Sequence, residues 1–286
     1  MKTKFIALLG GVLSLGLVNV ASAADMAVKA RPVVAPVVVS DWTGFYIGGS
    51  IGGRWTDNSW NTTCQETGFP GNPSCIVFAD RFATNNPQSF NSSAFRASIY
   101  GGYNWQVTSW VVGVEGDVGW ADNKRTNAGI PGVESPTVVG APGLDTSTVR
   151  TTWDAGLRGR VGYLVTPNVL FYGTGGVAFA HVEATSHCGT LFAVGWCGIA
   201  ANIGRTDTTS SDRVGWTLGG GVEAMFASNW LLRGEYRYAD FGNVGFTQLA
   251  GPTSNVDAFT ASVKYRTHTA LVGLAYKFGG PIVARY

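Results

Sequence analysis

The sequence of 286 residues has little charge: 13% of its residues are Asp, Glu, Lys or Arg, and their formal sum is +2. This weak balance, without a concentrated basic stretch, gives no general attraction to nucleic acid or acidic ligands. Long apolar runs are absent after residue 20, which excludes a bundle of membrane-spanning helices, since each needs ~20 apolar residues. Histidine is also scarce, with 3 in the chain.

Glycine and aromatic residues are abundant instead. The chain has 40 Gly, 10 Trp, 10 Tyr and 15 Phe, and its length allows one large domain or two small ones. Few charges, many glycines and many rings are typical of closely packed strands whose aromatic side chains lie at an interface. The composition therefore favours an all-β protein.

The N-terminus has the pattern of a secretory signal peptide. Two early lysines precede the almost wholly apolar segment 5–20, and Ala21-Ser22-Ala23 supplies the small residues before a cleavage site. We expect residues 1–23 to be removed after Ala23. An uncleaved membrane anchor is the alternative, but the apolar segment is shorter than the ~20 residues of a spanning helix. Residues 24–41, rich in Val, Ala and Pro, are expected to form an extended periplasmic lead-in.

From Trp42 onward, apolar residues alternate with small or polar ones. Between Trp110 and Trp120 the even positions are mostly apolar, whereas Glu115 and Asp117 point to the opposite side. This period of two predicts strands with one apolar and one polar face. The predicted strands are 43–56, 93–107, 110–123, 151–165, 169–183, 213–227, 230–242 and 263–278.

Short and long connections alternate strictly between these strands. The short ones, 108–109, 166–168 and 228–229, suit tight hairpins. The long ones, near 57–92, 124–150, 184–212 and 243–262, are rich in Thr, Ser, Asn, Gly and Pro and are expected to be irregular and exposed. This asymmetry predicts an eight-stranded antiparallel up-and-down transmembrane β-barrel over 42–278, with both termini in the periplasm and a C-terminal extension at 279–286.

The two faces of the predicted strands differ sharply. Large apolar residues such as Phe45, Ile99 and Leu218 share one face, and aromatic residues near strand ends fit a membrane-interface girdle (Trp105, Trp110, Tyr163, Trp230 and Phe278). Charged residues of both signs share the other. These are Arg96, Glu115, Asp117, Asp154, Arg158, Arg160, Glu223, Arg233, Glu235, Arg237 and Lys277.

We interpret the charged face as the lining of a narrow lumen filled by ion pairs. Eight strands enclose an interior just wide enough for side chains, and opposite charges with hydrogen bonds are tolerated there. A catalytic or ion-conducting site is the alternative use of these residues. A soluble eight-stranded ligand carrier is a further alternative, but it would bury the apolar face and expose the charges.

The four cysteines fall into two long connections. Cys64 and Cys75 lie in the first, and Cys188 and Cys197 lie in the third. In an exported protein this locality predicts the disulfides Cys64–Cys75 and Cys188–Cys197. A metal site is disfavoured because the spacings are too long for a Cys-x-x-Cys knuckle and no histidine pattern accompanies them.

One histidine raises an enzymatic alternative. His268 falls on the outward face of the last strand, and barrel enzymes that process lipid A use histidine and serine at the lipid face. No serine or carboxylate completes such a site on the same strand, so an interfacial histidine is favoured. We expect no catalytic residue, cofactor or metal.

Several motifs resemble one family. The segment Asp41-Trp42-Thr43-Gly44-Phe45-Tyr46-Ile47-Gly48-Gly49 resembles the start of the alphaproteobacterial outer-membrane immunogenic proteins, small porin-family barrels related to the OmpA transmembrane domain. Further matching segments are 113–117, 173–178, 219–223, 232–238 and 272–278. The resemblance implies an outer-membrane location, surface antigenic loops, a role in envelope integrity and, for some relatives, haemin binding.

The expected function is therefore that of a non-enzymatic outer-membrane barrel that contributes to envelope integrity and displays antigenic loops. A small-solute porin and a surface protein that binds haemin or a host ligand through loops 57–92 or 184–212 are the alternatives. Expected partners are outer-membrane lipid, lipopolysaccharide and the barrel-assembly machinery, with no nucleic acid. Phe278 and Tyr286 both qualify as the terminal aromatic that this machinery reads.

Overall fold

The computed structural model describes residues 38–39, 41–65, 86–132, 145–188, 205–227, 229–249, 258–279 and 282–283. They belong to the unit Val37–Tyr286. The predicted signal peptide lies outside the described residues. No helix in the described part of the chain is long and apolar enough to cross a membrane. The strands are β1 (Val38–Val39), β2 (Gly44–Gln65), β3 (Gln88–Ser89), β4 (Ser92–Val107), β5 (Trp110–Ala128), β6 (Thr146–Thr166), β7 (Val169–Cys188), β8 (Arg205–Phe226), β9 (Trp230–Gln248), β10 (Phe259–Lys277) and β11 (Ile282–Val283).

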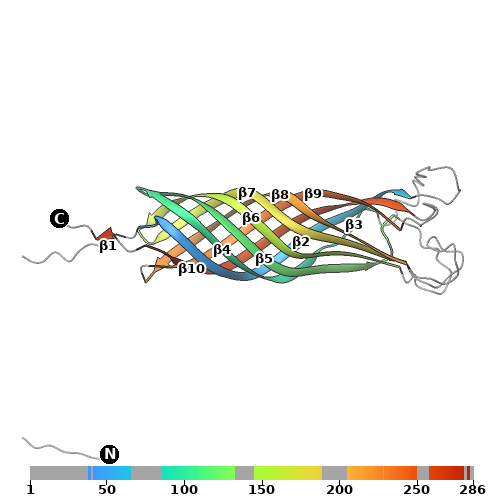
Figure 1. Cartoon of the computed structure of the whole chain (residues 1–286), viewed down its shortest axis with the longest axis horizontal. Coiled ribbons are helices and arrows are strands. Elements are labelled where there is room, and N and C mark those ends of the chain that lie inside the picture. Colours follow the sequence, from blue (N-terminus) through green and yellow to red (C-terminus); the bar gives the residue numbers. More distant parts are fainter. Residues whose placement is uncertain are drawn as a thin grey trace, which may run out of the picture. The chain divides into compact units, whose positions relative to one another are not determined.

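The eight long strands form a closed antiparallel barrel (Figure 1). Each long strand pairs with its neighbours along the chain, and β10 closes the ring by pairing with β2, from Lys277↔Tyr46 to Phe259↔Gln65. The predicted fold class is thus confirmed. A ninth strand joins the same sheet: β3, two residues long, pairs with β2 within the segment predicted as the first long connection.

Tight turns join the strands at one end of the barrel, which we call the turn end. The connections after Val107, Thr166 and Phe226 agree with the three predicted hairpins. Backbone amides bond across neighbouring turns, as from Leu164 to the Ser109 carbonyl at 2.8 Å. We call the opposite end, where the long connections lie, the loop end.

Beyond the turn end, the lead-in and the C-terminal extension are joined. Val38 pairs with Val283 and Val39 pairs with Ile282 in a separate two-stranded antiparallel sheet. The sequence predicted an extended lead-in and a C-terminal extension, without a pairing between them. The pairing has a simple physical basis, because both segments carry β-branched residues, which favour strands.

An apolar outward surface surrounds the half of the barrel nearer the turn end. Phe45 is 66% exposed and Trp55 is 47% exposed, and Ile47 and Ile51 are exposed between them. The ten residue-to-residue steps from Phe45 to Trp55, at ~3.3 Å rise and a tilt of about 40°, climb about 25 Å. This equals the height of the apolar band of a membrane barrel, so we call this zone the band.

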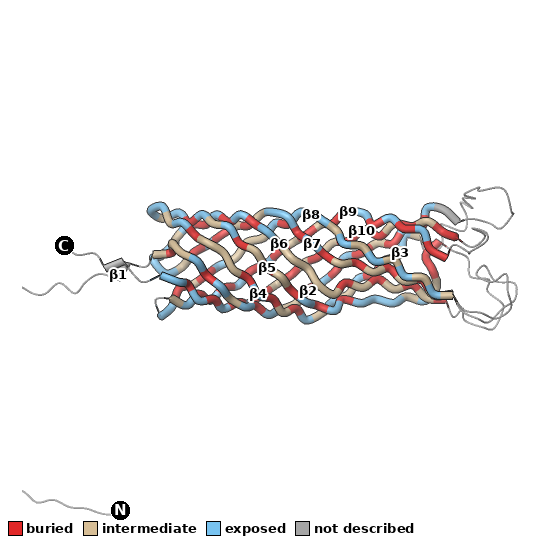
Figure 2. The backbone as a smooth tube through the Cα atoms, viewed as in Figure 1, coloured by how far each residue is buried: buried red, intermediate tan, exposed pale blue. Residues whose placement is uncertain are grey.

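The strands continue well past the band, which corrects the predicted connections. The described parts of 57–92, 124–150, 184–212 and 243–262 are largely strand. There the alternation continues with the faces exchanged: in β10, Phe259, Ala261 and Val263 are buried, whereas the residues between them are only half-buried (Figure 2). The outward residues of these segments are polar, as in a loop. The prediction required apolar outward positions and therefore missed these strands.

The wall of the barrel separates into two sheets at the loop end. β8 pairs with β9 only as far as Trp216↔Asp240, and β4 pairs with β5 only as far as Ala97↔Trp120. Beyond these points, the described residues form one sheet of β5, β6, β7 and β8 and another of β9, β10, β2, β3 and the first residues of β4, which pair with β2. We call them the β5–β8 sheet and the β9–β3 sheet.

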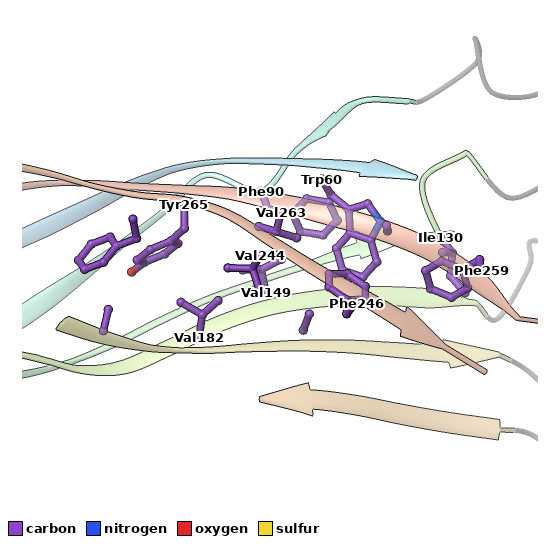
Figure 3. Packing of buried hydrophobic residues seen from close by; sticks show 14 of the residues in the cluster. Trp60, Phe90, Ile130, Val149, Val182, Val244, Phe246, Phe259, Val263 and Tyr265 are labelled. Carbon is purple, nitrogen blue, oxygen red and sulfur yellow. The ribbon is translucent and has the colours of Figure 1, made fainter. Parts of the chain in front are cut away.

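An apolar core fills the space between the two sheets (Figure 3). The β9–β3 sheet contributes most of the rings, with Trp60 lying 4.9 Å from Phe246 and 5.5 Å from Phe90 between ring centroids. The β5–β8 sheet contributes small side chains such as Ala180 and Val182. Large residues facing small ones let two sheets pack closely, so the loop end is a β-sandwich rather than an open tube.

A second apolar cluster lies inside the turn end. Trp42, Val111 and Leu170 are buried there together with Met225 and Leu231. The Trp42 indole donates to the Pro167 carbonyl at 3.0 Å, which fixes the ring across the end of the barrel. The remaining interior lies between this cluster and the sandwich core, inside the band.

Candidate functional site

The interior of the band holds the charged residues that the sequence assigned to the lumen. The ten residues proposed as lumen ion pairs all lie on inward faces, and Asp154, with its side chain 16% exposed, is the least buried of them. Arg96 comes from β4, Glu115 and Asp117 from β5, and Asp154, Arg158 and Arg160 from β6; Glu223 comes from β8, and Arg233, Glu235 and Arg237 come from β9. Lys277 is buried nearer the turn end and donates to the Thr43 carbonyl at 3.2 Å.

Two arginines and two glutamates form the part of the network nearer the turn end. Arg160 pairs with Glu223, and Arg233 pairs with Glu223 at 3.2 Å and with Glu115 at 2.7 Å. Arg160 also lies 3.7 Å from Glu115. These contacts connect β5, β6, β8 and β9 through the interior.

Asp117 is the centre of the part nearer the loop end. It accepts from Arg96 at 2.9 Å, from Arg237 at 2.9 Å and from Arg158 at 3.2 Å. Arg158 also pairs with Glu115 at 2.6 Å and with Glu235 at 2.7 Å, so it joins both parts into one network.

Arg54 extends the network and was missed by the sequence assignment. Its guanidinium pairs with Asp154 at 2.6 Å and donates to the carbonyls of Ala121 and Thr151 at 2.6 and 3.0 Å. Asp154 also pairs with Arg96 at 2.6 Å. The signal was present, because Arg54 precedes Trp55 in a predicted strand and must therefore face inward.

Three tyrosines that the sequence did not single out complete the interior. The Tyr46 hydroxyl donates to Glu115 at 2.7 Å, and the Tyr172 hydroxyl donates to Glu235 at 2.8 Å. The Arg233 guanidinium lies 4.1 Å from the ring centroid of Tyr100, within the range of a cation–π interaction. All three tyrosines occupy inward positions in the alternating pattern of their strands. This alternation is the sequence signal that could have identified them.

Glycine provides the room for these long side chains. A Cβ placed on Gly119 would lie 2.3 Å from the Arg96 guanidinium, and one placed on Gly102 would lie 2.6 Å from the Tyr46 hydroxyl oxygen. Both glycines occupy inward positions beside a bulky partner. The high glycine content therefore follows partly from the need to fit large charged and aromatic side chains within eight strands.

The network pairs six arginines with five carboxylates. Every carboxylate contacts at least two arginines: Glu115, Asp117 and Glu235 contact three each, and Asp154 and Glu223 contact two each. Their oxygens are occupied by fixed donors, an arrangement that links strands across the interior. It suits cross-bracing of the barrel better than proton transfer, which needs a group able to exchange a proton with a substrate.

Outside the barrel, His268 lies where the sequence expected it. It is on the outward side of β10, and its Nδ1 lies 2.6 Å from the Tyr236 hydroxyl oxygen. The Tyr238 ring is 5.1 Å away between centroids, and Trp216 follows Tyr238 at 5.3 Å. This aromatic group borders the band on its loop-end side. No group of three or more His, Cys, Asp or Glu able to hold a metal occurs in the described residues.

The interfacial aromatic residues predicted from the sequence lie at the turn-end border of the band. The Trp110 ring is 5.3 Å from Tyr163, and the Trp230 ring is 5.4 Å from Tyr276. Trp105 and Phe278 are also exposed on this border. Two aromatic borders about 25 Å apart are the arrangement that anchors a barrel at both membrane interfaces.

The predicted disulfides and ligand-binding loops lie mostly outside the described residues. Cys64 is in β2 and Cys188 ends β7, whereas Cys75 and Cys197 are not among the residues described. The pairings Cys64–Cys75 and Cys188–Cys197 therefore stay predictions, as does binding of haemin or a host ligand by these connections.

Comparisons with known proteins agree with this architecture. Residues 11–278 match the family model described as outer membrane protein beta-barrel domain. The 31 kDa outer-membrane immunogenic protein of Brucella melitensis biotype 1 is 30% identical over 265 residues, which cover 90% of this chain and 93% of the relative. The 22 kDa outer membrane protein of Rhizobium leguminosarum bv. viciae is 26% identical over 245 residues, covering 85% and 82%.

Among solved structures, the outer membrane protein OprG from Pseudomonas aeruginosa aligns with a TM-score of 0.44 and 11% identity, covering 85% of this chain and 100% of that chain.

Proposed function

The chain belongs to the family of outer membrane protein β-barrel domains, and from that premise we propose that it is a non-enzymatic, non-conducting barrel that braces the outer membrane and displays its loop end at the cell surface. The resemblance to outer-membrane immunogenic proteins read from the sequence is confirmed, as is the outer-membrane location. The bracing and display roles are the proposal.

The filled interior is the observation that carries this proposal. Three successive layers occupy it: the apolar cluster around Trp42, the charged network, and the sandwich core around Trp60. Arg158 and Trp60 are both buried, and each contacts side chains from more than one strand. A water-filled channel needs a continuous open path, so this packing favours a structural barrel over the small-solute porin.

Planar-bilayer recording tests the closed interior. We expect the purified, folded protein to give no reproducible conductance steps. A triple variant Arg158→Ala, Glu115→Ala and Glu235→Ala, which removes the connection between the two parts of the network, should also give no steps if it inserts, because the Trp42 cluster and the sandwich core still close the interior on either side. Reproducible steps from the unchanged protein would contradict the proposal and favour the porin.

Loss of the protein in the native bacterium tests the bracing role. A barrel that contributes to envelope integrity should, when deleted, increase uptake of a dye or a large antibiotic that the intact outer membrane excludes. Complementation with the Glu223→Gln variant, at matched amounts in the membrane, should restore less of this exclusion than the unchanged protein. An unaltered envelope after deletion would contradict the proposal.

The non-enzymatic part of the proposal is tested at His268. The described surroundings of this residue are aromatic: Tyr236 accepts or donates the hydrogen bond at 2.6 Å, and Tyr238 packs beside it. We expect lipid A from cells carrying His268→Ala to have the same mass spectrum as lipid A from cells with the unchanged protein. A lipid A species that disappears with this variant, and with deletion of the protein, would establish an enzyme instead.

A further inference from the structure

Two cations follow the outward side of β10 beyond the loop-end border of the band. His268 belongs to the aromatic group at this border, and Arg266 and Lys264 lie two and four residues closer to the loop end on the same side. At ~3.3 Å rise and a tilt of about 40°, these steps climb about 5 and 10 Å. A lipid headgroup layer is roughly 5–8 Å thick, so Arg266 lies within this layer and Lys264 lies at its outer edge.

Arg266 is held in one orientation by Asp240 of β9. Its Nε donates to the Asp240 carboxylate at 3.1 Å. The same carboxylate accepts from the Gly242 amide at 2.8 Å and from the Tyr238 hydroxyl at 3.3 Å. Among the described residues, none accepts from the two terminal amino groups of Arg266. A guanidinium fixed through Nε, with both amino groups free, can bind a phosphate through two bonds.

A bulge in β9 produces this arrangement. The β9–β10 ladder shifts between Lys264↔Asn243 and Arg266↔Asp240, and Gly242 has a φ of 70°. This conformation favours glycine, and it brings the Gly242 amide onto the Asp240 carboxylate. The orientation of Arg266 is therefore built into two paired strands.

Lys264 provides a second cation beside Arg266. Its neighbours in the two ladders, Ser59 of β2 and Asn243 of β9, carry no charge. Its side chain makes no ion pair within the part of the chain that the structure describes. The ammonium group is therefore available to an anion that approaches Arg266.

The carboxylates of this surface leave both cations available at short range. Asp57 stands opposite Arg266 in the β2–β10 ladder, and it makes no ion pair among the described residues. Asp240 is already held by three donors. The formal charges of Lys264, Arg266, Asp57 and Asp240 cancel, so the surface has little long-range attraction for a free anion. An anion that is brought to this depth by its own apolar part can still use the free donors.

The opposite side of the barrel offers a comparison at about the same depth. Lys124 lies four residues beyond the outward Trp120, and Arg150 is its neighbour on β6. Arg150 is already occupied: two of its nitrogens donate to Asp122 at 2.7 and 3.2 Å, and the third lies 4.0 Å from Glu183. The arginine on that side is thus satisfied within the protein, which leaves no free fork for a phosphate.

We propose that Lys264 and Arg266 bind a phosphate on the sugar headgroup of a glycolipid in the outer leaflet. Two phosphate oxygens accept from the terminal amino groups of Arg266, and the Lys264 ammonium donates to the same phosphate. The proposal rests on the proposed display of the loop end at the cell surface, since this display places the two cations in the outer leaflet.

Depth and surroundings favour a lipid as the source of this phosphate. Trp55 and Tyr238 flank His268 on β2 and β9, and such rings lie at the headgroup level of a membrane. Lysine and arginine just beyond such rings attract anionic headgroups. Val272 and Leu274 are exposed on the same side of β10 within the band. The acyl chains of the bound lipid would contact them, and a free phosphate lacks these contacts.

The test is native mass spectrometry of the full-length protein, folded in detergent and titrated with bisphosphorylated lipid A. We expect saturable binding of one lipid A. Lipid A without its phosphates should bind about tenfold more weakly, because the donors of Arg266 and Lys264 lose their acceptor. Inorganic phosphate in large excess should not displace bisphosphorylated lipid A.

Matched variants locate the site, and each is measured on protein that retains heat-modifiable migration. Lys264→Gln and Arg266→Gln should each weaken binding about tenfold, whereas Lys124→Gln should leave it unchanged. Asp57→Asn should strengthen binding several-fold, because it removes an unpaired carboxylate opposite Arg266. Absence of saturable binding, equal binding of lipid A without phosphates, or an equal loss with Lys124→Gln overturns the proposal. Complete displacement by inorganic phosphate overturns it as well, since the site would then recognise the free anion.

Failure of this proposal is distinguishable from failure of the proposed function. In detergent, lipid A reaches both ends of the barrel, so an absence of binding counts against Lys264 and Arg266 whatever the orientation in the cell. Protease accessibility of the loop end on intact cells measures display separately.

Discussion

Arg160 and Glu223 form an ion pair that no solvent reaches: their side chains are 1% and 0% exposed. They come from β6 and β8, which are separated in the barrel by β7. Arg233 of β9 shares the same carboxylate at 3.2 Å. One glutamate therefore holds three strands together across the interior, in a zone where the outward surface is apolar and contributes no polar bonds.

Removing this carboxylate should destabilise the barrel strongly. Glu223→Gln leaves Arg160 and Arg233 buried with one fewer negative charge, and breaking a buried pair in this way costs about 3–5 kcal/mol. Urea unfolding of the protein in lipid vesicles, followed by tryptophan fluorescence, measures the change in the free energy of unfolding.

Two further variants separate the buried pair from a general effect of charge. Arg160→Met combined with Glu223→Gln should lower the free energy of unfolding less than Glu223→Gln alone, because it removes one of the two cations that lose their carboxylate. Asp122→Asn, which breaks the exposed pair with Arg150 at 2.7 Å, should change little, since exposed pairs contribute little. Equal losses for Glu223→Gln and Asp122→Asn would refute bracing by the network.

The sandwich at the loop end should unfold separately from the band. Trp60 is fully buried among Phe90, Phe246 and Phe259. Trp60→Ala leaves a cavity there and should cost about 3–5 kcal/mol. We expect limited proteolysis to cut the loop end of this variant faster, while the barrel keeps its heat-modifiable migration on a gel.

Trp55→Ala is the matched control for this prediction, because Trp55 lies on the same strand but faces outward at the border of the band. It should leave the protease sensitivity of the loop end unchanged. If Trp60→Ala abolished heat-modifiable migration, the two zones would form a single cooperative unit and the separation would be wrong.

The band could be predicted from sequence because its outward positions are unusually constrained. Lipid-facing sites such as Val112 and Val114 must be apolar, so the alternation with Glu115 and Asp117 is easy to detect. The same reasoning placed Arg158 and Arg237 inside. It could not give their partners, because pairing between distant strands depends on the register and tilt of the closed barrel.

The loop-end strands escaped prediction for the opposite reason. Segments such as Arg205–Asp212 contain almost only Thr, Ser and charged residues, a composition shared by loops and by outward strand faces in water. The apolar core at the loop end is built from residues on different strands: Phe246 and Phe259 belong to β9 and β10, and Val182 and Ala184 belong to β7. A pattern within one strand cannot show that a core exists between two sheets.

The disulfide prediction can be checked directly on the folded protein. Non-reducing digestion followed by mass spectrometry should give the linked peptides Cys64–Cys75 and Cys188–Cys197, and no cysteine should react with an alkylating reagent before reduction. Because Cys64 and Cys188 lie in strands, each bond would attach its connection to the sandwich and restrict that connection in the unfolded state. A Cys64–Cys188 peptide, or free thiols, would show that pairing by locality is wrong.

The last prediction concerns the residue that directs insertion into the membrane. The Phe278 amide donates to the Phe45 carbonyl at 2.8 Å, which continues the closing ladder of β10 and β2, and its ring lies 5.3 Å from Tyr276 on the turn-end border of the band. We expect an aromatic residue at this place to present the final strand to the assembly machinery in its paired register. We therefore expect Phe278→Ala to slow the appearance of the heat-modifiable form several-fold in vesicles that contain the machinery, and Tyr286→Ala to have no effect.

In vesicles without the machinery the two variants should fold at similar rates, which separates recognition from strand stability. A slower rate with Tyr286→Ala alone would transfer the signal to the C-terminal extension.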